Sequence, residues 1–204
     1  TIRRNNRVNP FLFATLFALF FSRVHGAKWD LEYWQYVNVK NWKKGAYELF
    51  TSGVVRFDQH ISDFYYARLT ENFVYQPLSY LGLEIHYSYI YNKPQGGTKF
   101  SHDHRLELEV NPLVHLNPRV TLQWRNRMDF TKKQNTSPIQ SVFRHRAMVI
   151  FPIENGGRLV YIQCSNEIFY DFNRNTFTQN RFIPAEVRLR FSKNNVVDLF
   201  VMVR

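Results

Sequence analysis

The residues best suited to chemistry are arginines and glutamates that alternate with apolar residues in successive segments of the chain. Arg125 and Arg127 are two positions apart, as are Arg144 and Arg146. Residues two apart share one face of a β-strand, so these side chains would meet those of neighbouring strands. Guanidinium groups match carboxylates in shape and charge. The expected network comprises Arg105, Glu107, Glu109, Arg125, Arg127, Arg144, Arg146, Glu167, Glu186, Arg188 and Arg190.

Two kinds of chemistry are open to this network. If each arginine has a carboxylate partner, salt bridges fill the inside of a narrow β-barrel and stabilise its wall. If arginines remain in excess, they favour a pore or pocket for small anionic solutes. Arginine outnumbers glutamate in the network, which keeps the second alternative open. The carboxylate partners of Arg125, Arg127, Arg144 and Arg146 would distinguish the two.

The motif Ser101-His-Asp-His104 is a second candidate. His102 and His104 would share a face on a strand and could bind a metal ion there. No cysteine cluster or Glu-x-x-His pair accompanies them, and no spacing singles out a nucleophile, a base and an orienting group. We interpret them as solvated loop histidines, and we expect no catalytic residue, no metal site and no cofactor.

Long strands are needed to position these side chains. Ten segments alternate apolar and polar residues, and residues typical of turns separate them. They exceed the five or six residues usual in soluble strands and match the roughly nine to eleven of a tilted membrane strand. The segments are 29–40, 46–57, 63–75, 80–91, 104–114, 118–130, 141–151, 158–170, 179–191 and 196–204.

Each predicted strand has an apolar face and a polar face. In 80–91, Ile85 and Tyr87 oppose Glu84 and His86. Aromatic residues gather near strand ends, as in the girdles of membrane barrels. A soluble sandwich also alternates, so a buried core with exposed charges is the alternative. In 179–191, the predicted apolar face is Ile183, Ala185, Val187, Leu189 and Phe191, opposite Glu186, Arg188 and Arg190.

The N-terminal segment has the layout of a secretory signal peptide. A basic head with Arg3, Arg4 and Arg7 precedes the apolar run 11–21, and small residues follow at Gly26. The run is shorter than the roughly 20 residues that span a bilayer as a helix, although a retained anchor is the alternative. We expect residues 1–26 to be the signal peptide and 27–204 a single β-barrel domain, which could lack its last strand.

The net charge and the cysteine content limit the binding partners and the disulfide bonds that we expect. Removal of 1–26 takes away four arginines and no acid, which lowers the net charge from +11 to +7. We expect no nucleic-acid binding, because the chain carries a secretory signal and its arginines are spread over all segments. Cys164 is alone, so no disulfide forms within the chain. Phosphate-bearing outer-membrane lipid is the expected partner of Lys43, Lys44, Lys93, Lys99, Lys132, Lys133 and Lys193.

The second half of the chain carries a recognisable series of motifs. They are 119–127 (RVTLQWRNR), 143–146 (FRHR), 166–170 (NEIFY) and 177–181 (FTQNR). This series resembles an uncharacterised family of predicted outer-membrane β-barrels known as a numbered domain of unknown function (DUF2490-like). The resemblance covers about residues 29–204. It implies a fold and a location, and it supplies no catalytic residues.

We therefore predict an all-β, antiparallel, up-and-down transmembrane β-barrel of about ten to twelve strands in a bacterial outer membrane. Its expected role is structural, or the transport of small solutes with a leaning towards anions. One alternative is a soluble secreted or periplasmic barrel or sandwich that binds a small ligand. A weaker alternative is a hydrolase embedded in a barrel, which needs a Ser–His or Asp–His pair.

Overall fold

The computed structural model describes residues 33–58, 62–93, 97–134, 138–153, 157–192 and 196–203. The predicted signal peptide, 1–26, lies outside this part of the chain. The described residues form ten strands, one for each predicted segment. They are β1 (Tyr33–Lys44), β2 (Tyr47–Asp58), β3 (Asp63–Leu78), β4 (Leu81–Asn92), β5 (Ser101–Asn117), β6 (Val120–Lys133), β7 (Gln140–Pro152), β8 (Leu159–Asp171), β9 (Thr176–Arg190) and β10 (Val196–Val203).

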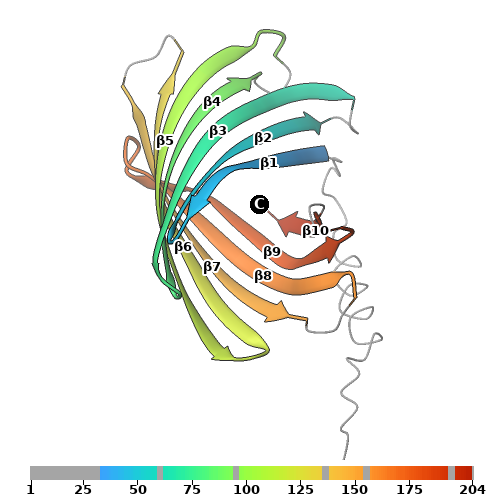
Figure 1. The fold of residues 1–204 in the computed structure, drawn as a ribbon. Helices are drawn as coiled ribbons and strands as arrows, with labels where there is room; N and C mark the ends of the chain where they lie inside the picture. Colours follow the sequence, from blue (N-terminus) through green and yellow to red (C-terminus); the bar gives the residue numbers. More distant parts are fainter. Residues whose placement is uncertain are drawn as a thin grey trace, which may run out of the picture.

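The strands form one antiparallel sheet in which each pairs with its neighbours in the sequence, from β1 to β10. Figure 1 shows this sheet curled into a half-barrel. The all-β, up-and-down architecture is thus confirmed, and the strands belong to one sheet rather than to two stacked ones. Among the described residues, no helix is long and apolar enough to cross a membrane.

The sheet has two edge strands, because β1 and β10 do not pair with each other. They approach through side chains: the rings of Trp34 and Phe200 meet edge to face with centroids 5.9 Å apart. The guanidinium group of Arg56 lies over the Trp34 ring at 3.9 Å. Among the described residues, an aromatic contact therefore links the two edge strands.

The two faces of the sheet differ in polarity. No second layer covers the sheet in the described part of the chain, so side chains can be buried only on its concave face, where curvature brings them together. The buried hydrophobic side chains there are Val54, Ile90, Phe169 and Ile183. The buried polar ones are Ser52, Thr70, Asn72, His86, Ser88, Asp103, Glu107, Glu109, Asn111, Thr121, Arg127, Asp129, Thr131, Gln163, Ser165, Glu167, Asp171 and Glu186.

One predicted face is wrong in β9. Ser165 pairs with Ile183 and Gln163 pairs with Glu186, so two residues of β9 lie opposite the single residue Cys164. This bulge includes Pro184, which has no N–H to give to a regular ladder. As a result Ile183 is buried on the same face as Glu186, and not with Val187 and Leu189.

Tight turns join several strands at one end of the sheet. The β1–β2 turn consists of Gly45 and Ala46, and Gly45 has a φ of 57°. An L-residue with a Cβ is disfavoured in this left-handed conformation. A Cβ at this position would meet no atom within 4 Å, so a steric clash is not the reason for glycine here. The backbone conformation itself requires it.

The Gly45→Ala variant should lose about 1 kcal/mol of unfolding free energy, measured by urea titration, because of this conformation. Gly53→Ala is the matched control: it also has open space around its Cβ position, but its φ lies outside the left-handed region. We expect no loss for the control. Equal losses in the two variants would show that the turn conformation is not the cause.

Candidate functional site

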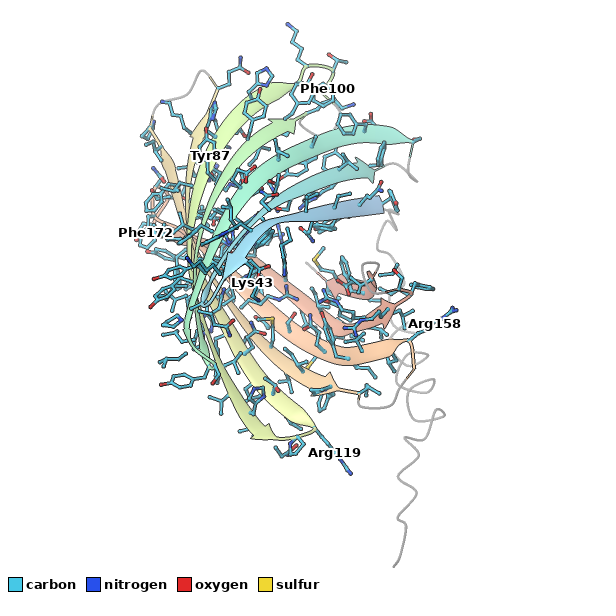
Figure 2. All side chains as sticks on the ribbon, in the orientation of Figure 1. Lys43, Tyr87, Phe100, Arg119, Arg158 and Phe172 are labelled. Carbon is cyan, nitrogen blue, oxygen red and sulfur yellow. The ribbon has the colours of Figure 1, made fainter. Side chains whose placement is uncertain are left out.

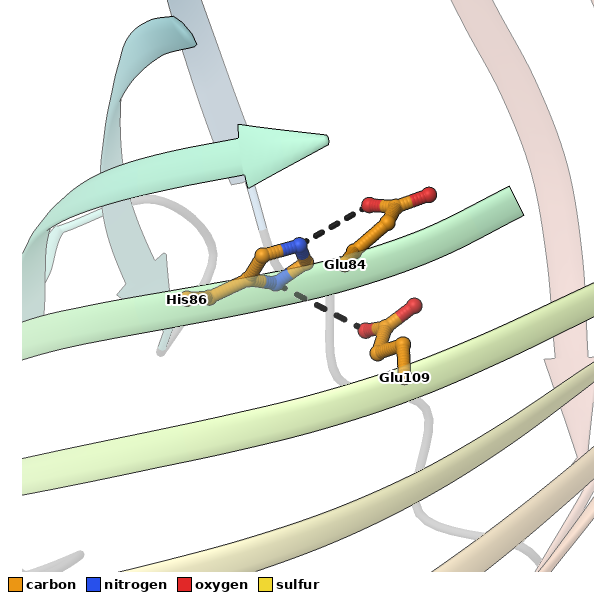
Figure 3. Close-up of side chains that lie close together, drawn as sticks. All are labelled: Glu84, His86 and Glu109. Carbon is orange, nitrogen blue, oxygen red and sulfur yellow. Dashed lines mark hydrogen bonds and ion pairs between the residues drawn. The ribbon is translucent and has the colours of Figure 1, made fainter. Parts of the chain in front are cut away.

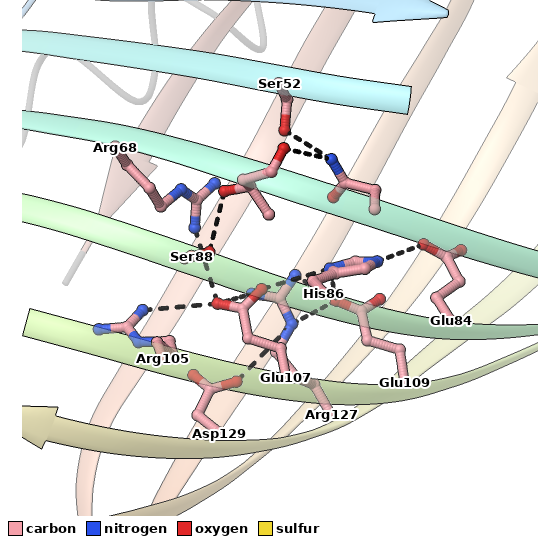
Figure 4. Close-up of polar contacts among 12 residues, drawn as sticks. Ser52, Arg68, Glu84, His86, Ser88, Arg105, Glu107, Glu109, Arg127 and Asp129 are labelled. Carbon is pink, nitrogen blue, oxygen red and sulfur yellow. Dashed lines mark hydrogen bonds and ion pairs between the residues drawn. The ribbon is translucent and has the colours of Figure 1, made fainter. Parts of the chain in front are cut away.

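The concave face of β4–β8 carries a continuous network of charged side chains, shown in part in Figure 4. The antiparallel register creates it. Glu109 lies opposite Arg127, and Glu107 lies opposite Asp129. Arg127 in turn lies opposite Arg144 on β7. Because alternate residues point to the same face, each strand adds charged side chains to one surface.

Glu107 lies at the centre of one half of this network and is 1% exposed. Its Oε1 atom lies 3.7 Å from Arg68, 3.6 Å from Arg105 and 3.3 Å from Arg127. Its Oε2 atom lies 3.3 Å from Nδ1 of His86. Four cationic or hydrogen-bonding groups on four strands thus converge on a single buried carboxylate.

Arg127 connects Glu107 to two further carboxylates. It donates a short hydrogen bond to Glu109, and its Nε atom lies 3.9 Å from Asp129. Arg127 is itself 8% exposed. A buried guanidinium group is tolerated only if carboxylates compensate its desolvation, and here three of them do.

Glu167 on β8 organises the second half of the network. It accepts hydrogen bonds from Arg125 at 2.6 Å and from Arg144 at 2.9 Å. Arg144 also lies 3.4 Å from Asp129, which joins the two halves. Arg146 donates to Ser165 at 2.9 Å and lies 3.4 Å from Glu186. Each of the four arginines on β6 and β7 thus has a carboxylate partner.

An aromatic ring lies within this charged surface. Phe169 is 8% exposed, and the guanidinium groups of Arg144 and Arg181 each lie 4.5 Å from its ring centroid. Guanidinium groups are attracted to the face of an aromatic ring. Phe169 therefore separates two arginines while remaining a favourable neighbour for both.

Two of the predicted network residues lie at its margin, beyond Glu186 on β9. Arg188 donates two hydrogen bonds of 2.6 Å to Asp198 on the edge strand β10 and stacks over Tyr161. Arg190 is exposed at the end of β9. The structure brings the other predicted residues together and adds four that the prediction omitted: Arg68, Glu84, His86 and Asp129.

The motif 101–104 lies on a strand rather than in a loop, because β5 begins at Ser101. His102 and His104 share the outward face, and their Nδ1 atoms form hydrogen bonds with the hydroxyl groups of Tyr89 and Tyr87 at 2.6 and 2.7 Å. Asp103 lies on the concave face and accepts a 2.8 Å hydrogen bond from Asn92. The motif is therefore divided between two faces and does not form a catalytic triad.

Removal of the Arg127 guanidinium group from the centre of the network should lower the free energy of unfolding. Arg127→Met leaves Glu107 and Glu109 buried without their main partner, so we expect a loss of about 3–5 kcal/mol in unfolding free energy. Arg174→Met is the control, because the Arg174 side chain is 74% exposed and its ion pair with Asp171 is long, at 3.9 Å. Its expected loss is below about 1 kcal/mol. Similar small losses in both would contradict the importance of the buried network.

A comparison with known families places this geometry in context. No curated protein matches the chain. One family model, described as "Protein of unknown function (DUF2490)", matches residues 31–204, which include all ten strands and the whole charged network. The chain belongs to this DUF2490 family.

Proposed function

We propose that this chain is an outer-membrane β-barrel protein with a structural role, whose concave face is an ion-paired wall. The observation that carries the proposal is the inverted polarity of the sheet, which buries charged side chains and exposes apolar ones. A water-soluble protein gains stability by the opposite arrangement. A barrel in lipid requires an apolar outer surface and tolerates a polar interior.

The outward apolar surface is continuous across the middle strands. The register joins Phe73 to Ile85, Ile85 to Leu108, Leu108 to Met128 and Met128 to Phe143. Phe73, Ile85 and Leu108 are 39%, 50% and 41% exposed. Large exposed apolar patches on soluble proteins mark binding or membrane surfaces. Lipid is the partner that covers a surface extending over so many strands.

Aromatic and basic residues mark one boundary of this surface. Where β4 ends and β5 begins, Tyr91 stacks on Phe100 with centroids 4.3 Å apart, and Phe100 also contacts Phe64. Nζ of Lys93 lies 5.6 Å from the Phe100 ring. Figure 2 shows Phe100 at this end of the sheet. Aromatic rings beside lysine are typical of the lipid–water interface.

Several polar groups on the outward face have hydrogen-bond partners. Asn126 and His145 bond to each other at 2.8 Å. The carboxyl group of Glu71 accepts hydrogen bonds of 2.9 and 3.0 Å from Thr51. In hydrocarbon an unpaired polar group costs several kcal/mol, so this pairing suits a lipid-facing surface.

Complete pairing favours a closed wall over an open anion pathway. Arg125, Arg127, Arg144 and Arg146 each have a carboxylate within 3.4 Å. A paired guanidinium group offers less attraction to a passing anion, because its charge and donors are already engaged.

Transport of small anionic solutes is the second candidate, and one feature of the register supports it. Arg125 lies directly opposite Arg146, and Arg127 directly opposite Arg144. Four arginine residues therefore occupy a compact square of backbone positions on β6 and β7. The Nε atom of Arg125 is buried and has no hydrogen-bond partner. Such a square could receive an anion if a carboxylate moved aside.

Fractionation of bacterial cells that produce the full chain tests the main proposal. We expect the protein in the outer-membrane fraction, with a folded form that migrates faster on a gel before boiling than after. A known outer-membrane porin and a soluble periplasmic protein are the controls. Recovery with the soluble protein, at a mobility that boiling does not change, would refute the membrane location.

Recording across a planar lipid bilayer separates the two candidates. The ion-paired wall predicts no stepwise conductance from the folded protein. Steps with a reversal potential that favours anions would support transport instead. In that case Arg146→Gln should reduce the anion preference, whereas the exposed Arg174→Gln should not.

A further inference from the structure

The concave wall contains a group of side chains with the composition of a metal site. Glu84 and His86 on β4 and Glu109 on β5 each offer one ligand atom within 4.8 Å of the others (Figure 3). His86 and Glu109 are buried, at 7% and 5% exposure. Imidazole nitrogen and carboxylate oxygen together are the ligands that zinc and related transition-metal ions accept.

The strand register creates a need for positive charge at this point. Glu84 lies directly opposite Glu109 in the β4–β5 pair. Like charges in directly opposite positions destabilise a sheet. Arg127 compensates Glu109. Within the described chain, the charged partner at salt-bridge distance from Glu84 is His86, with 2.8 Å between Nε2 and the carboxylate.

Asn111 provides an independent indication of a ligand. It is 8% exposed, and its Nδ2 atom donates to Glu84 at 2.7 Å and to Glu109 at 3.3 Å. Its Oδ1 atom is buried without a hydrogen-bond partner. Rotation of the amide about its last side-chain bond would place this oxygen against both carboxylates. Only a cation between the oxygens would make that arrangement favourable, because Nδ2 would give up its two carboxylate acceptors.

We propose that Glu84, His86, Glu109 and Asn111 bind one divalent transition-metal ion of the zinc class. Zinc–ligand bonds of about 2.0–2.2 Å in tetrahedral geometry place ligand atoms about 3.3–3.6 Å apart, so the cluster must close by roughly 1 Å to bind the ion. The ion would replace the proton of His86 as the partner of Glu84 and would tie β4 to β5. Calcium fits less well, because it selects oxygen ligands alone. The inference does not depend on the membrane location.

Zinc binding to the folded, tag-free full chain tests the site. Equilibrium dialysis followed by metal analysis should find one Zn²⁺ per chain. Glu84→Gln and His86→Asn should each weaken binding at least tenfold, because each removes a ligand. Glu71→Gln, which removes a carboxylate from the outward face, is the matched control and should bind like the wild type. Absence of zinc binding by the wild type, or undiminished binding by both ligand variants, would overturn the proposal.

A second measurement avoids the risk that a variant fails to fold. X-ray absorption of the zinc-loaded wild type should show one imidazole and otherwise oxygen ligands. Two imidazoles would place the ion on His102 and His104 of the outward face, and the concave site would then be rejected. A sulfur ligand would implicate Cys164 and lead to the same rejection.

Discussion

The carboxylate of Glu107 is 1% exposed and has three arginines and one histidine around it. An ionised carboxylate that is buried without such partners costs several kcal/mol. Its position therefore requires Arg68, Arg105, Arg127 and His86 to come from β3, β5, β6 and β4 in one fixed register. The same requirement applies to the neighbouring residues. Buried Arg127 needs the charges of Glu109 and Asp129, and Asp129 also pairs with Arg144 on β7. The network thus fixes how at least five strands are aligned.

The curvature of the sheet follows from the same distribution. Charged side chains that pair with neighbours from several strands draw the concave face together, and in the described residues only Val54, Ile90, Phe169 and Ile183 are buried hydrophobic side chains. The convex face is left with a continuous apolar surface, and the proposed lipid environment rests on it. Charged and apolar side chains alternate along the strands. The residues that stabilise the concave face therefore also determine which residues the convex face exposes.

The strands and their faces could be predicted because alternation is a local property of the sequence. Arg125 and Arg127 could be placed on one face from their spacing alone, and the structure puts them there. The face of Ile183 could not, because the bulge at Pro184 shifts parity in a way that alternation does not reveal. Pro184 was the available signal, since proline cannot donate to a regular ladder.

The members of the network were harder to predict than the strands. Glu84, His86 and Asp129 could be assigned to polar faces, but their convergence on shared partners depends on long-range register. Arg68 was missed because its strand was not divided into faces. Arg188 was misplaced because its partner, Asp198, lies on an edge strand whose pairing only the three-dimensional structure reveals.

The central claim is that the outward face of the middle strands lies in lipid. Nitroxide labels on single cysteines at Leu106, Leu108 and Val110, in a Cys164→Ser background, test it by power-saturation electron paramagnetic resonance in reconstituted vesicles. The predicted result is strong relaxation by oxygen and weak relaxation by a water-soluble nickel chelate at all three outward positions, since oxygen concentrates in hydrocarbon. Strong relaxation by the chelate and weak relaxation by oxygen would mean that this surface faces water, and would contradict the claim.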